Sequence, residues 1–464
     1  MDYRIEKDSL GEVKVPVDKL YGAQTARAVE NFPIGEEKMP IEIIRAYGIL
    51  KKAAVLANHE LELIDIEKCE YIFEAADQLI KGELDQHFPI SLWQTGSGTQ
   101  TNMNVNEVLA NKVSLLAGEK LGSKKPVHPN DDVNMSQSSN DTFPTAMALA
   151  AVIKLEDFLL PIFADLKAEL EKKSRRYKDL VKVGRTHLMD ATPITLGQEF
   201  EAFAAQLTNI IEMIKDSLKY LKRLPIGGTA VGTGLNTKTD FAKVVVQYIN
   251  LETDKDFVAA KNKSAGIAAH DSFVNLSGAL KTAASFLMKL ANDTRWLSSG
   301  PRCGIGEIKI PKNEPGSSIM PGKVNPTQAE ALFQASAQVM ANDTAVNIGG
   351  GSGNFQLNVA KPLIIYNILQ SIRLLGDSTA SYNKRCLSGI EADREQIAKY
   401  LESSLMVVTA LNPVIGYDRS AEIAQKAFVE KITLKEAAVD LGYLSEEEFD
   451  NYVDPKKMTE PNIS

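Results

Sequence analysis

Long stretches of helical periodicity constrain the fold of this chain more than any other feature. Between positions 196 and 221, apolar residues recur every three or four positions, which predicts an amphipathic helix of about seven turns. Stretches at 273–297 and 140–170 have the same periodicity, and Pro161 predicts a kink in the latter. The apolar positions of the first stretch are Leu196, Phe200, Phe203, Leu207, Ile210, Ile214, Leu218 and Leu221.

Two further stretches, near 326–347 and 361–385, extend the helical pattern. Helices of this length cannot each bury an apolar stripe alone, so we expect the five to pack as a bundle. An extended coiled coil is the alternative, but Gly-rich loops between the stretches would interrupt a long rod. The chain is therefore predicted to be mainly α.

The bundle divides the chain into three predicted domains. Residues 1–136 are expected to contain shorter helices and loops, and the five-helix bundle is expected at 137–390. The remaining part, 391–464, has the pattern of small helices, including Leu434–Leu441. A length of 464 residues agrees with several domains, since a single core rarely grows beyond about 250–300 residues.

Charge and cysteine content narrow the class of protein. The formal net charge is −8 and no long basic run occurs, which argues against nucleic acid and anionic membrane as partners. Three cysteines, far apart, indicate neither a disulfide framework nor a zinc site. The first residues lack the features of a signal or transit peptide, and no apolar run approaches the ~18 residues of a membrane span. We expect a cytoplasmic protein, and nothing in the sequence calls for a metal or organic cofactor.

The segment Gly316-Ser-Ser-Ile-Met-Pro-Gly-Lys-Val-Asn-Pro326 is the strongest functional signal. Its glycines can adopt backbone angles that other residues avoid, and its prolines stiffen the chain between them. A lysine held in this frame, with two serines and an asparagine, suits a mobile lid that brings a positive charge and several donors onto an anion. A Gly-rich surface loop is the alternative, but other segments point to the same chemistry.

Four other loops are rich in small polar residues: Thr95–Asn102, His128–Asp141, Gly184–Pro193 and Gly227–Asn236. Successive N–H groups at a helix start bind anions, and hydroxyl groups add donors. Plain turns and helix capping are the alternatives, and capping is compatible with ligand binding because both use the same helix end. The fourth loop fits neither a Walker nor a dinucleotide-binding pattern, and we interpret it as packing or support.

Among the five histidines, His187 has the most suggestive neighbours. It follows Gly184-Arg-Thr186 and shortly precedes Asp190 and Pro193. In isolation, a histidine is more often structural than catalytic. The sequence contexts of His59, His87 and His270 lack such neighbours, and we interpret these three as structural.

Taken together, the loops resemble the class II fumarase branch of the fumarase/aspartase superfamily. The similarity begins at Tyr21-Gly-Ala-Gln-Thr25 and ends near Leu441-Gly-Tyr-Leu-Ser445, so it covers nearly the whole chain. The segment at 316–326 is highly specific for the superfamily. The other matching segments are Trp93–Thr99, His128–Asp132, Ser136–Asp141 and Gly184–Leu188.

The residues after the lid favour fumarase over aspartate ammonia-lyase, the nearest alternative. The chain reads Asn325-Pro-Thr-Gln-Ala-Glu330, as fumarases do, where aspartases usually have apolar residues and a proline. Asp190-Ala-Thr-Pro193 and Gly227-Gly-Thr-Ala230 also resemble fumarases. A non-enzymatic structural protein is a further alternative, since some relatives became lens proteins, but such a protein could lose the site residues that are present here.

The resemblance implies a mostly helical, three-domain subunit and a homotetramer whose central helices form a joint bundle. Each active site would be assembled from three subunits, which explains how separated loops can serve one small dicarboxylate. The implied reaction, a step of the tricarboxylic acid cycle, is the reversible trans hydration of fumarate to L-malate through an aci-carboxylate carbanion. This intermediate carries about three negative charges, so preorganised donors are needed to stabilise it.

The resemblance also implies roles for individual residues. Ser317 would abstract the proton, activated as an alkoxide by lid N–H groups and a cation. His187 would be the general acid/base, with Glu330 as its carboxylate partner, and Thr186 would help it hold the water or leaving hydroxyl. The implied substrate-binding residues are Ser97, Thr99, Ser138, Ser139, Asn140, Thr186, Ser318, Lys323 and Asn325.

A second anion site is implied at His128, Asn130 and Asp131. Many family members carry an arginine just upstream, where this chain has Lys124 and Lys125. A lysine keeps the charge but loses the bidentate geometry of a guanidinium. Turns and helix capping explain His128–Asp131 almost as well.

Overall fold

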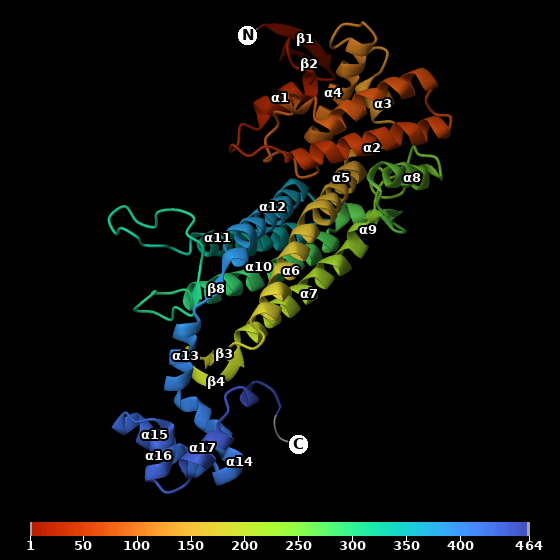
Figure 1. Cartoon of the computed structure of the whole chain (residues 1–464). Coiled ribbons are helices and arrows are strands. Elements are labelled where there is room, and N and C mark those ends of the chain that lie inside the picture. Colours follow the sequence, from red (N-terminus) through yellow and green to blue (C-terminus); the bar gives the residue numbers. More distant parts are fainter. Residues whose placement is uncertain (1, 462–464) are drawn as a thin grey trace. The chain divides into compact units, whose positions relative to one another are not determined.

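The computed structural model describes residues 2–461, and the protein is mainly α-helical, as predicted (Figure 1). The chain forms two compact units, each described here by itself. The first consists of the chain up to Pro161 with Ile210–Ser285 and Ala335–Gly376, and the second of Ile162–Asn209, Phe286–Gln334 and the chain from Asp377 onward. The chain passes from one unit to the other five times, each time within a helix, so the predicted three-domain division, with boundaries near 136 and 390, stays a prediction.

The first unit begins with a hairpin that the sequence patterns did not reveal. Strand β1 (Tyr3–Asp8) pairs antiparallel with β2 (Gly11–Pro16). The buried position of β1 is Glu6, only 7% exposed, whose carboxylate accepts hydrogen bonds from the guanidinium of Arg4 at 2.6 and 2.8 Å. Because a paired charge occupies the buried position, the strand lacks the apolar alternation that would predict it.

Helix α4 anchors the chain that leads into α1. The carboxylate of Glu107, buried within α4, accepts backbone hydrogen bonds from Gly22, Gln24 and Thr25 at 2.9, 2.7 and 3.0 Å. It thereby supplies the N-terminal cap that Gly22 cannot provide. The helices of this part are α1 (Ala23–Asn31), α2 (Ile41–Glu60), α3 (Ile66–Lys81) and α4 (Thr99–Leu116).

The long helices confirm the periodicity argument. All eight apolar positions expected on the inner face of α7 are buried. A π-helical turn at Leu155–Leu159 lies directly before α6, whose second residue is Pro161, and the kink expected at Pro161 stays a prediction. These helices are α5 (Ser139–Lys154), α6 (Leu160–Arg176), α7 (Leu196–Leu221), α10 (Asp271–Leu297), α11 (Thr327–Gly350) and α12 (Lys361–Arg385).

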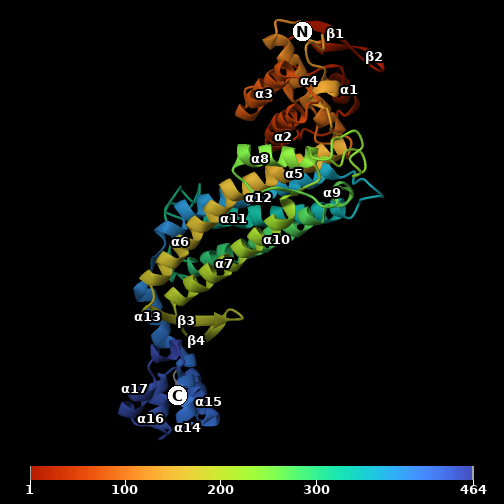
Figure 2. The same ribbon diagram turned by 90° about the vertical axis from the view of Figure 1, so that its right-hand side faces the viewer.

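Polar contacts tie the long helices together within each unit, and Figures 1 and 2 show α10, α11 and α12 side by side. In the first unit, the Ser277 hydroxyl donates to Asp343 at 2.7 Å, which joins α10 to α11. In the second unit, the hydroxyls of Thr294 and Tyr382 lie 2.7 Å apart and join α10 to α12. Each bond requires one orientation of the two helices about their axes, whereas an apolar stripe alone would permit a range of orientations.

The C-terminal part of the second unit has its own small core. Leu411, Ile423, Ala437 and Phe449 are among the buried residues of this cluster. The predicted small helix at Leu434–Leu441 is confirmed as α16, and hydroxyl caps begin α16 and α17. The helices are α13 (Arg394–Ser403), α14 (Asn412–Ile415), α15 (Tyr417–Glu430), α16 (Leu434–Asp440) and α17 (Glu446–Tyr452).

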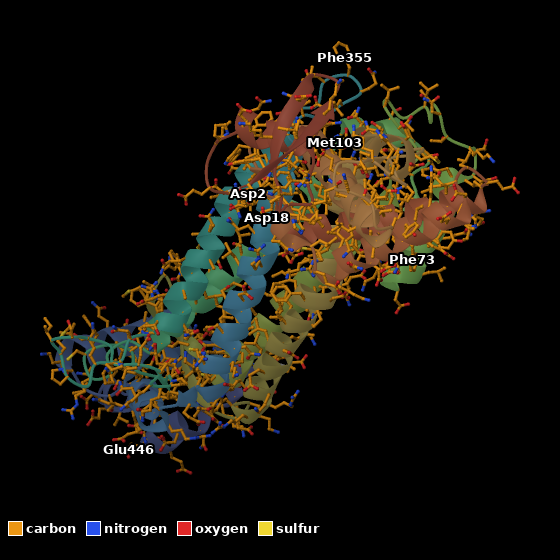
Figure 3. All side chains as sticks on the ribbon, turned by 90° about the horizontal axis from the view of Figure 1, so that it is seen from above. Asp2, Asp18, Phe73, Met103, Phe355 and Glu446 are labelled. Carbon is orange, nitrogen blue, oxygen red and sulfur yellow. The ribbon has the colours of Figure 1, made fainter. Side chains whose placement is uncertain are left out.

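The remaining elements are short. The loop between α11 and α12 carries Phe355, whose side chain is 93% exposed and projects at the edge of Figure 3. Within residues 2–461, no helix combines the length and apolar character that crossing a membrane requires. The other elements are α8 (Phe241–Thr253), α9 (Lys263–Ala268), β3 (Val181–Thr186) with β4 (Met189–Thr195), β5 (Arg223–Leu224) with β6 (Val258–Ala259), and β7 (Ile308–Lys309) with β8 (Glu391–Ala392).

Candidate active site

In the first unit, a chain of hydroxyl groups joins the N-termini of α4 and α5. The Ser97 and Thr99 hydroxyls lie 2.9 Å apart, and those of Thr99 and Ser139 lie 2.7 Å apart. Gly98 precedes α4 with φ +78°, and a Cβ there would lie 2.0 Å from the Phe143 ring, so this close approach requires glycine. Two helix N-termini and their hydroxyls thus converge, an arrangement that favours an anion.

The start of α5 is fixed by two side chains that follow these hydroxyls. Ser138 caps the helix, since its hydroxyl accepts the N–H of Asn140 at 3.2 Å. The side-chain amide of Asn140 donates to the Ala230 carbonyl at 2.8 Å. A hydroxyl that accepts from the backbone keeps its own proton available, so capping by Ser138 is compatible with the predicted contact to substrate.

Asp141 connects α5 to the loop at Gly227–Asn236. Its fully buried carboxylate accepts backbone hydrogen bonds from Ser138, Gly227 and Thr229 at 2.9, 3.0 and 2.8 Å. Burial raises the pKa of Asp141 to about 7, against the lowering effect of these bonds. The loop therefore supports α5, in line with its interpretation from the sequence.

In the second unit, His187 lies at the tip of the β3–β4 hairpin. His187 and Leu188 form its two-residue turn with φ +58° and +61°, the signature of a type I′ turn. Turns of this type usually contain asparagine or glycine, so the His-Leu pair gave no hairpin signal in the sequence. The hairpin leaves Thr186 and His187 exposed. A general acid/base that acts in a site shared with another subunit would need this exposure.

Buried charges anchor this hairpin to the segment that precedes the lid. Glu307, fully buried, forms ion pairs with Lys182 at 3.0 Å and Arg185 at 2.9 Å, both on β3. These contacts are ion pairs without hydrogen-bond alignment. Lys182 also pairs with Glu199 at 2.9 Å, and burial raises the pKa of Glu199. The position of Thr186 and His187 therefore depends on Glu307.

The lid is a closed turn with backbone donors around its predicted base. The Ser317 hydroxyl oxygen accepts the N–H groups of Ile319 and Met320 at 3.2 and 3.0 Å. Gly316 donates its N–H to the Lys323 carbonyl at 3.0 Å, and the Asn325 side-chain amide donates back to the Gly316 carbonyl. Two N–H groups on one hydroxyl oxygen are the arrangement that would stabilise an alkoxide.

Several predicted contacts are not made within the chain. Among residues 2–461, no hydrogen bond or ion pair joins His187 to Glu330, which is half-buried in the first turn of α11. Ser318 and Lys323 are exposed on the lid. The chain brings together Ser97, Thr99, Ser138, Ser139 and Asn140, and the roles of all these residues stay predictions.

The predicted second anion site has a local structural role in the chain. The Nδ1 atom of His128 accepts the N–H groups of Asn130 and Asp131 at 3.3 and 3.2 Å. The backbone N–H of His128 donates to the carboxylate of Asp132 at 2.7 Å, and Lys68 pairs with that carboxylate at 2.9 Å. These bonds are the capping alternative considered from the sequence, and anion binding here stays a prediction.

Sequence reasoning missed Lys361, the first residue of α12. Its side chain is fully buried, and its Nζ lies 3.5 Å from the carbonyl oxygen of Asn140. The residue lies outside every polar loop, directly before the apolar run Pro362-Leu-Ile-Ile365. A lysine at the head of an apolar helix was the available signal, but only the fold reveals its proximity to α5.

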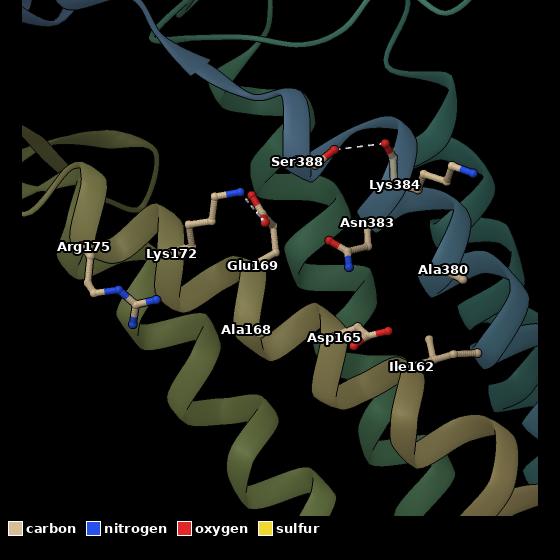
Figure 4. A pocket seen from close by; sticks show the side chains of 10 residues that line it. All are labelled: Ile162, Asp165, Ala168, Glu169, Lys172, Arg175, Ala380, Asn383, Lys384 and Ser388. Atoms are coloured by element: carbon tan, nitrogen blue, oxygen red, sulfur yellow. Dashed lines mark hydrogen bonds and ion pairs between the residues drawn. The ribbon is translucent and has the colours of Figure 1, made fainter.

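A surface cavity of about 580 Å³ lies in the second unit, lined by α6, α12 and Ser388 (Figure 4). Its walls carry the acidic residues Asp165 and Glu169 together with Lys172, Arg175 and Lys384. None of the predicted site residues lines it. This cavity is therefore not the predicted site.

Two family models match the chain: one described as "Lyase" over residues 11–341, and one described as "Fumarase C C-terminus" over residues 407–460. Together with the helical fold and the polar loops, they define the protein as a lyase. The chain belongs to the class II fumarate hydratase family. The branch predicted from the residues after the lid is confirmed.

The relatives are similar over their whole length. "Fumarate hydratase class II" of Oceanobacillus iheyensis is 57% identical over 461 residues, which cover 99% of this chain and 100% of the relative. The protein of the same name from Helicobacter pylori is 53% identical over the same shares. Among solved structures, a class II fumarase from Schistosoma mansoni is 41% identical, with a TM-score of 0.97 and 99% of each chain covered.

Replacing Glu307 by glutamine is expected to destabilise the second unit. The substitution leaves Lys182 and Arg185 without their buried counter-charge, and breaking a buried ion pair costs about 3–5 kcal/mol. The free energy of unfolding, measured by urea titration of the circular dichroism signal, should fall by roughly that amount. Glu391→Gln is the matched control, because its pair with Arg176 is exposed and should matter little. Equal effects of the two substitutions would contradict the anchoring role.

Proposed function

We propose that this chain catalyses the reversible trans hydration of fumarate to L-malate. The observation that carries the proposal is the cluster of Ser97, Thr99 and Ser139 hydroxyls where α4 and α5 begin. Neutral donors at two converging helix N-termini suit the carboxylate of a small dicarboxylate. The identity of 57% to a class II fumarate hydratase over nearly the whole chain supports the same reaction.

Ser317 is the proposed base. In the dehydration direction, a base removes a proton from C3 of malate, and a substrate carboxylate takes up the charge as an aci-carboxylate. A neutral serine hydroxyl is a poor base, so it must react as an alkoxide. The N–H groups of Ile319 and Met320 support this state because they already point at the oxygen.

The other roles follow the chemistry of each group. His187 donates a proton to the leaving hydroxyl, with Thr186 beside it, and Glu330 is the proposed partner that orients the imidazole. Lys323, Asn325 and Ser318 bring the lid's charge and donors to a substrate carboxylate. A lysine and several neutral donors then face an intermediate with about three negative charges.

We propose further that the protein is a homotetramer with active sites shared among three subunits. The exposed face of α11 supports this assembly because none of its residues is charged, and a helix face without charge favours burial. Phe355, which is 93% exposed, supports it as well. So does His187, which is exposed and makes no hydrogen bond or ion pair within residues 2–461. The exposed positions of α11 are Ala331, Gln334, Ala337, Gln338, Ala341, Thr344, Asn347 and Ile348.

A cytoplasmic location is also proposed. Cys69, Cys303 and Cys386 are all free thiols, and Cys303 is exposed. Free thiols persist in reducing compartments, which supports the location expected from the sequence.

Ultraviolet absorbance tests the reaction directly. Purified protein mixed with L-malate should produce the absorbance of the fumarate double bond, because dehydration creates that conjugated bond. The same protein mixed with L-aspartate should produce none. A rise with aspartate alone would identify an ammonia-lyase, and no rise with either substrate would refute the proposed reaction.

Ser317→Ala should lower kcat for malate by about a hundredfold or more, because the substitution removes the proposed base. KM should change little, since the hydroxyls of α4 and α5 remain. Ser318→Ala is the matched comparison and should raise KM rather than lower kcat, as expected for a group that only binds carboxylate. Steady-state kinetics separate the two effects, and near-normal turnover by Ser317→Ala would show that another group is the base.

Mixing two inactive variants tests the shared site. If His187 and Ser317 of one site come from different subunits, tetramers reassembled from equal amounts of His187→Ala and Ser317→Ala chains should contain about a quarter intact sites. Activity should therefore return after mixing and refolding, whereas each variant refolded alone should stay inactive. Light scattering confirms the assembly in each sample, and tetramers that regain no activity would contradict the sharing.

A further inference from the structure

Lys361 links the two loops that form the hydroxyl cluster. Its backbone N–H donates to the Gly96 carbonyl at 3.2 Å, directly before Ser97. Its Nζ donates to the Asn140 carbonyl at 3.5 Å, in the first turn of α5. The side chain is 0% exposed, so one buried lysine connects the approach to α4 with the start of α5.

The ammonium group of Lys361 has unused hydrogen-bonding capacity. An ammonium carries three donors, and within residues 2–461 this one makes a single, long hydrogen bond. Lys51, equally buried, donates to Asn134 and Gln137 at 3.1 and 3.0 Å. Lys173 likewise donates to two carbonyl groups at 2.9 and 2.8 Å. The hydrogen bonds of Lys51 and Lys173 compensate for the burial of their ammonium groups, whereas the single long bond of Lys361 does so only in part.

The ionisable groups around Lys361 give this region an excess of positive charge. Asp141 on α5, Lys51 on α2 and His270 before α10 are the groups whose charges act on one another here. Burial and the charge of Lys361 lower the pKa of His270 to about 3, so this imidazole is neutral. Its Nε2 atom is buried and has no hydrogen-bond partner in the part of the chain that the structure describes. With His270 neutral, one acidic group, Asp141, therefore stands against two amines, those of Lys51 and Lys361.

We propose that Lys361 is a positioning residue for the dicarboxylate, whose buried ammonium supplies positive charge beneath the Asn140 turn and thereby strengthens substrate binding. The inference rests on the proposed function, since it concerns the same site. Lys361 does not need to touch the substrate. A charge inside the protein is screened less than one on the surface, so it acts on a bound carboxylate across the first turn of α5.

The electrostatics of Lys361 are sensitive to pH. Burial lowers its pKa to about 7, and the charge of Asp141 opposes that shift. The group is therefore charged below pH 7 and loses its proton as the pH rises above 7. A bound dianion favours the charged form, so binding above pH 7 should draw a proton onto Lys361.

Two substitutions at Lys361 separate its charge from its hydrogen bond. Lys361→Met removes both, whereas Lys361→Gln retains a donor for the Asn140 carbonyl but not the charge. Both should raise KM for malate and for fumarate about tenfold and change kcat less, because the charge acts on bound substrate before and during reaction. A normal KM in Lys361→Gln would show that substrate binding does not need the charge of Lys361, which would overturn the proposal.

Lys51→Met is the matched control. Lys51 is equally buried and acts on the same Asp141, but its hydrogen bonds go to Asn134 and Gln137. Thermal melting should show destabilisation by both lysine-to-methionine substitutions, with a rise in KM only at position 361. An equal rise in KM for both would mean that each lysine acts only by compensating the negative charge of Asp141. That result would overturn the positioning role of Lys361.

Titration calorimetry with succinate provides a readout without turnover. In the unsubstituted protein at pH 8, the apparent binding enthalpy should differ between two buffers of different ionisation enthalpy, because binding takes up a proton. Lys361→Gln should abolish the difference. If the difference persists, the proton goes to another group, such as Asp141 or Lys51, whose pKa values burial also moves to about 7, and the inference fails.

The two proposals fail in distinguishable ways. If the unsubstituted protein turns over malate and the Lys361 variants match it in KM and proton uptake, only the inference about Lys361 is wrong. If the unsubstituted protein produces no fumarate from malate but its succinate binding weakens about tenfold in Lys361→Gln, the proposed reaction is wrong and Lys361 still positions a dicarboxylate.

Discussion

The buried carboxylate of Asp141 is the interaction on which the candidate site in the first unit depends. It holds three backbone N–H groups, one at the start of α5 and two in the loop at Gly227–Thr229. The position of α5 then places Ser139 against Thr99, and the hydroxyl cluster follows. Without this carboxylate, buried donors would lose their acceptor, at a cost of about 1–3 kcal/mol each.

In the second unit, buried ion pairs anchor the base of the β3–β4 hairpin, and the turn of this hairpin and the lid are exposed. Glu307 fixes the hairpin through Lys182 and Arg185, while the exposed His187 beyond them makes no hydrogen bond or ion pair within residues 2–461. The lid is likewise closed by its own backbone bonds and presents its side chains outward. Exposed tips on an anchored base are the arrangement expected if neighbouring subunits complete the site.

The sequence predicted the parts of the fold that repeat with a helical period and missed those that depend on pairing across the chain. The buried face of α7 follows directly from its apolar spacing. Strand β1 escaped prediction because Glu6 occupies its buried position, and the β3–β4 turn because His187 and Leu188 replace the usual turn residues. Of the predicted polar loops, Gly227–Asn236 contains no helix or strand, whereas most of Gly184–Pro193 belongs to strands β3 and β4. The grouping of the hydroxyl-bearing segments in space depends on contacts such as those of Asp141, which no local pattern contains.

The proposed division of positive charge between Lys323 and Lys361 would let an acidic chain bind a dianion. Lys323 is exposed on the lid, where solvent and salt screen it until the lid meets a substrate. Lys361 is fully buried, so its field on α5 does not depend on the position of the lid. A buried charge that does not rearrange during the reaction is preorganised, which is the property that makes electrostatic stabilisation effective. On this proposal, the lid needs to add only the charge and donors that complete the site.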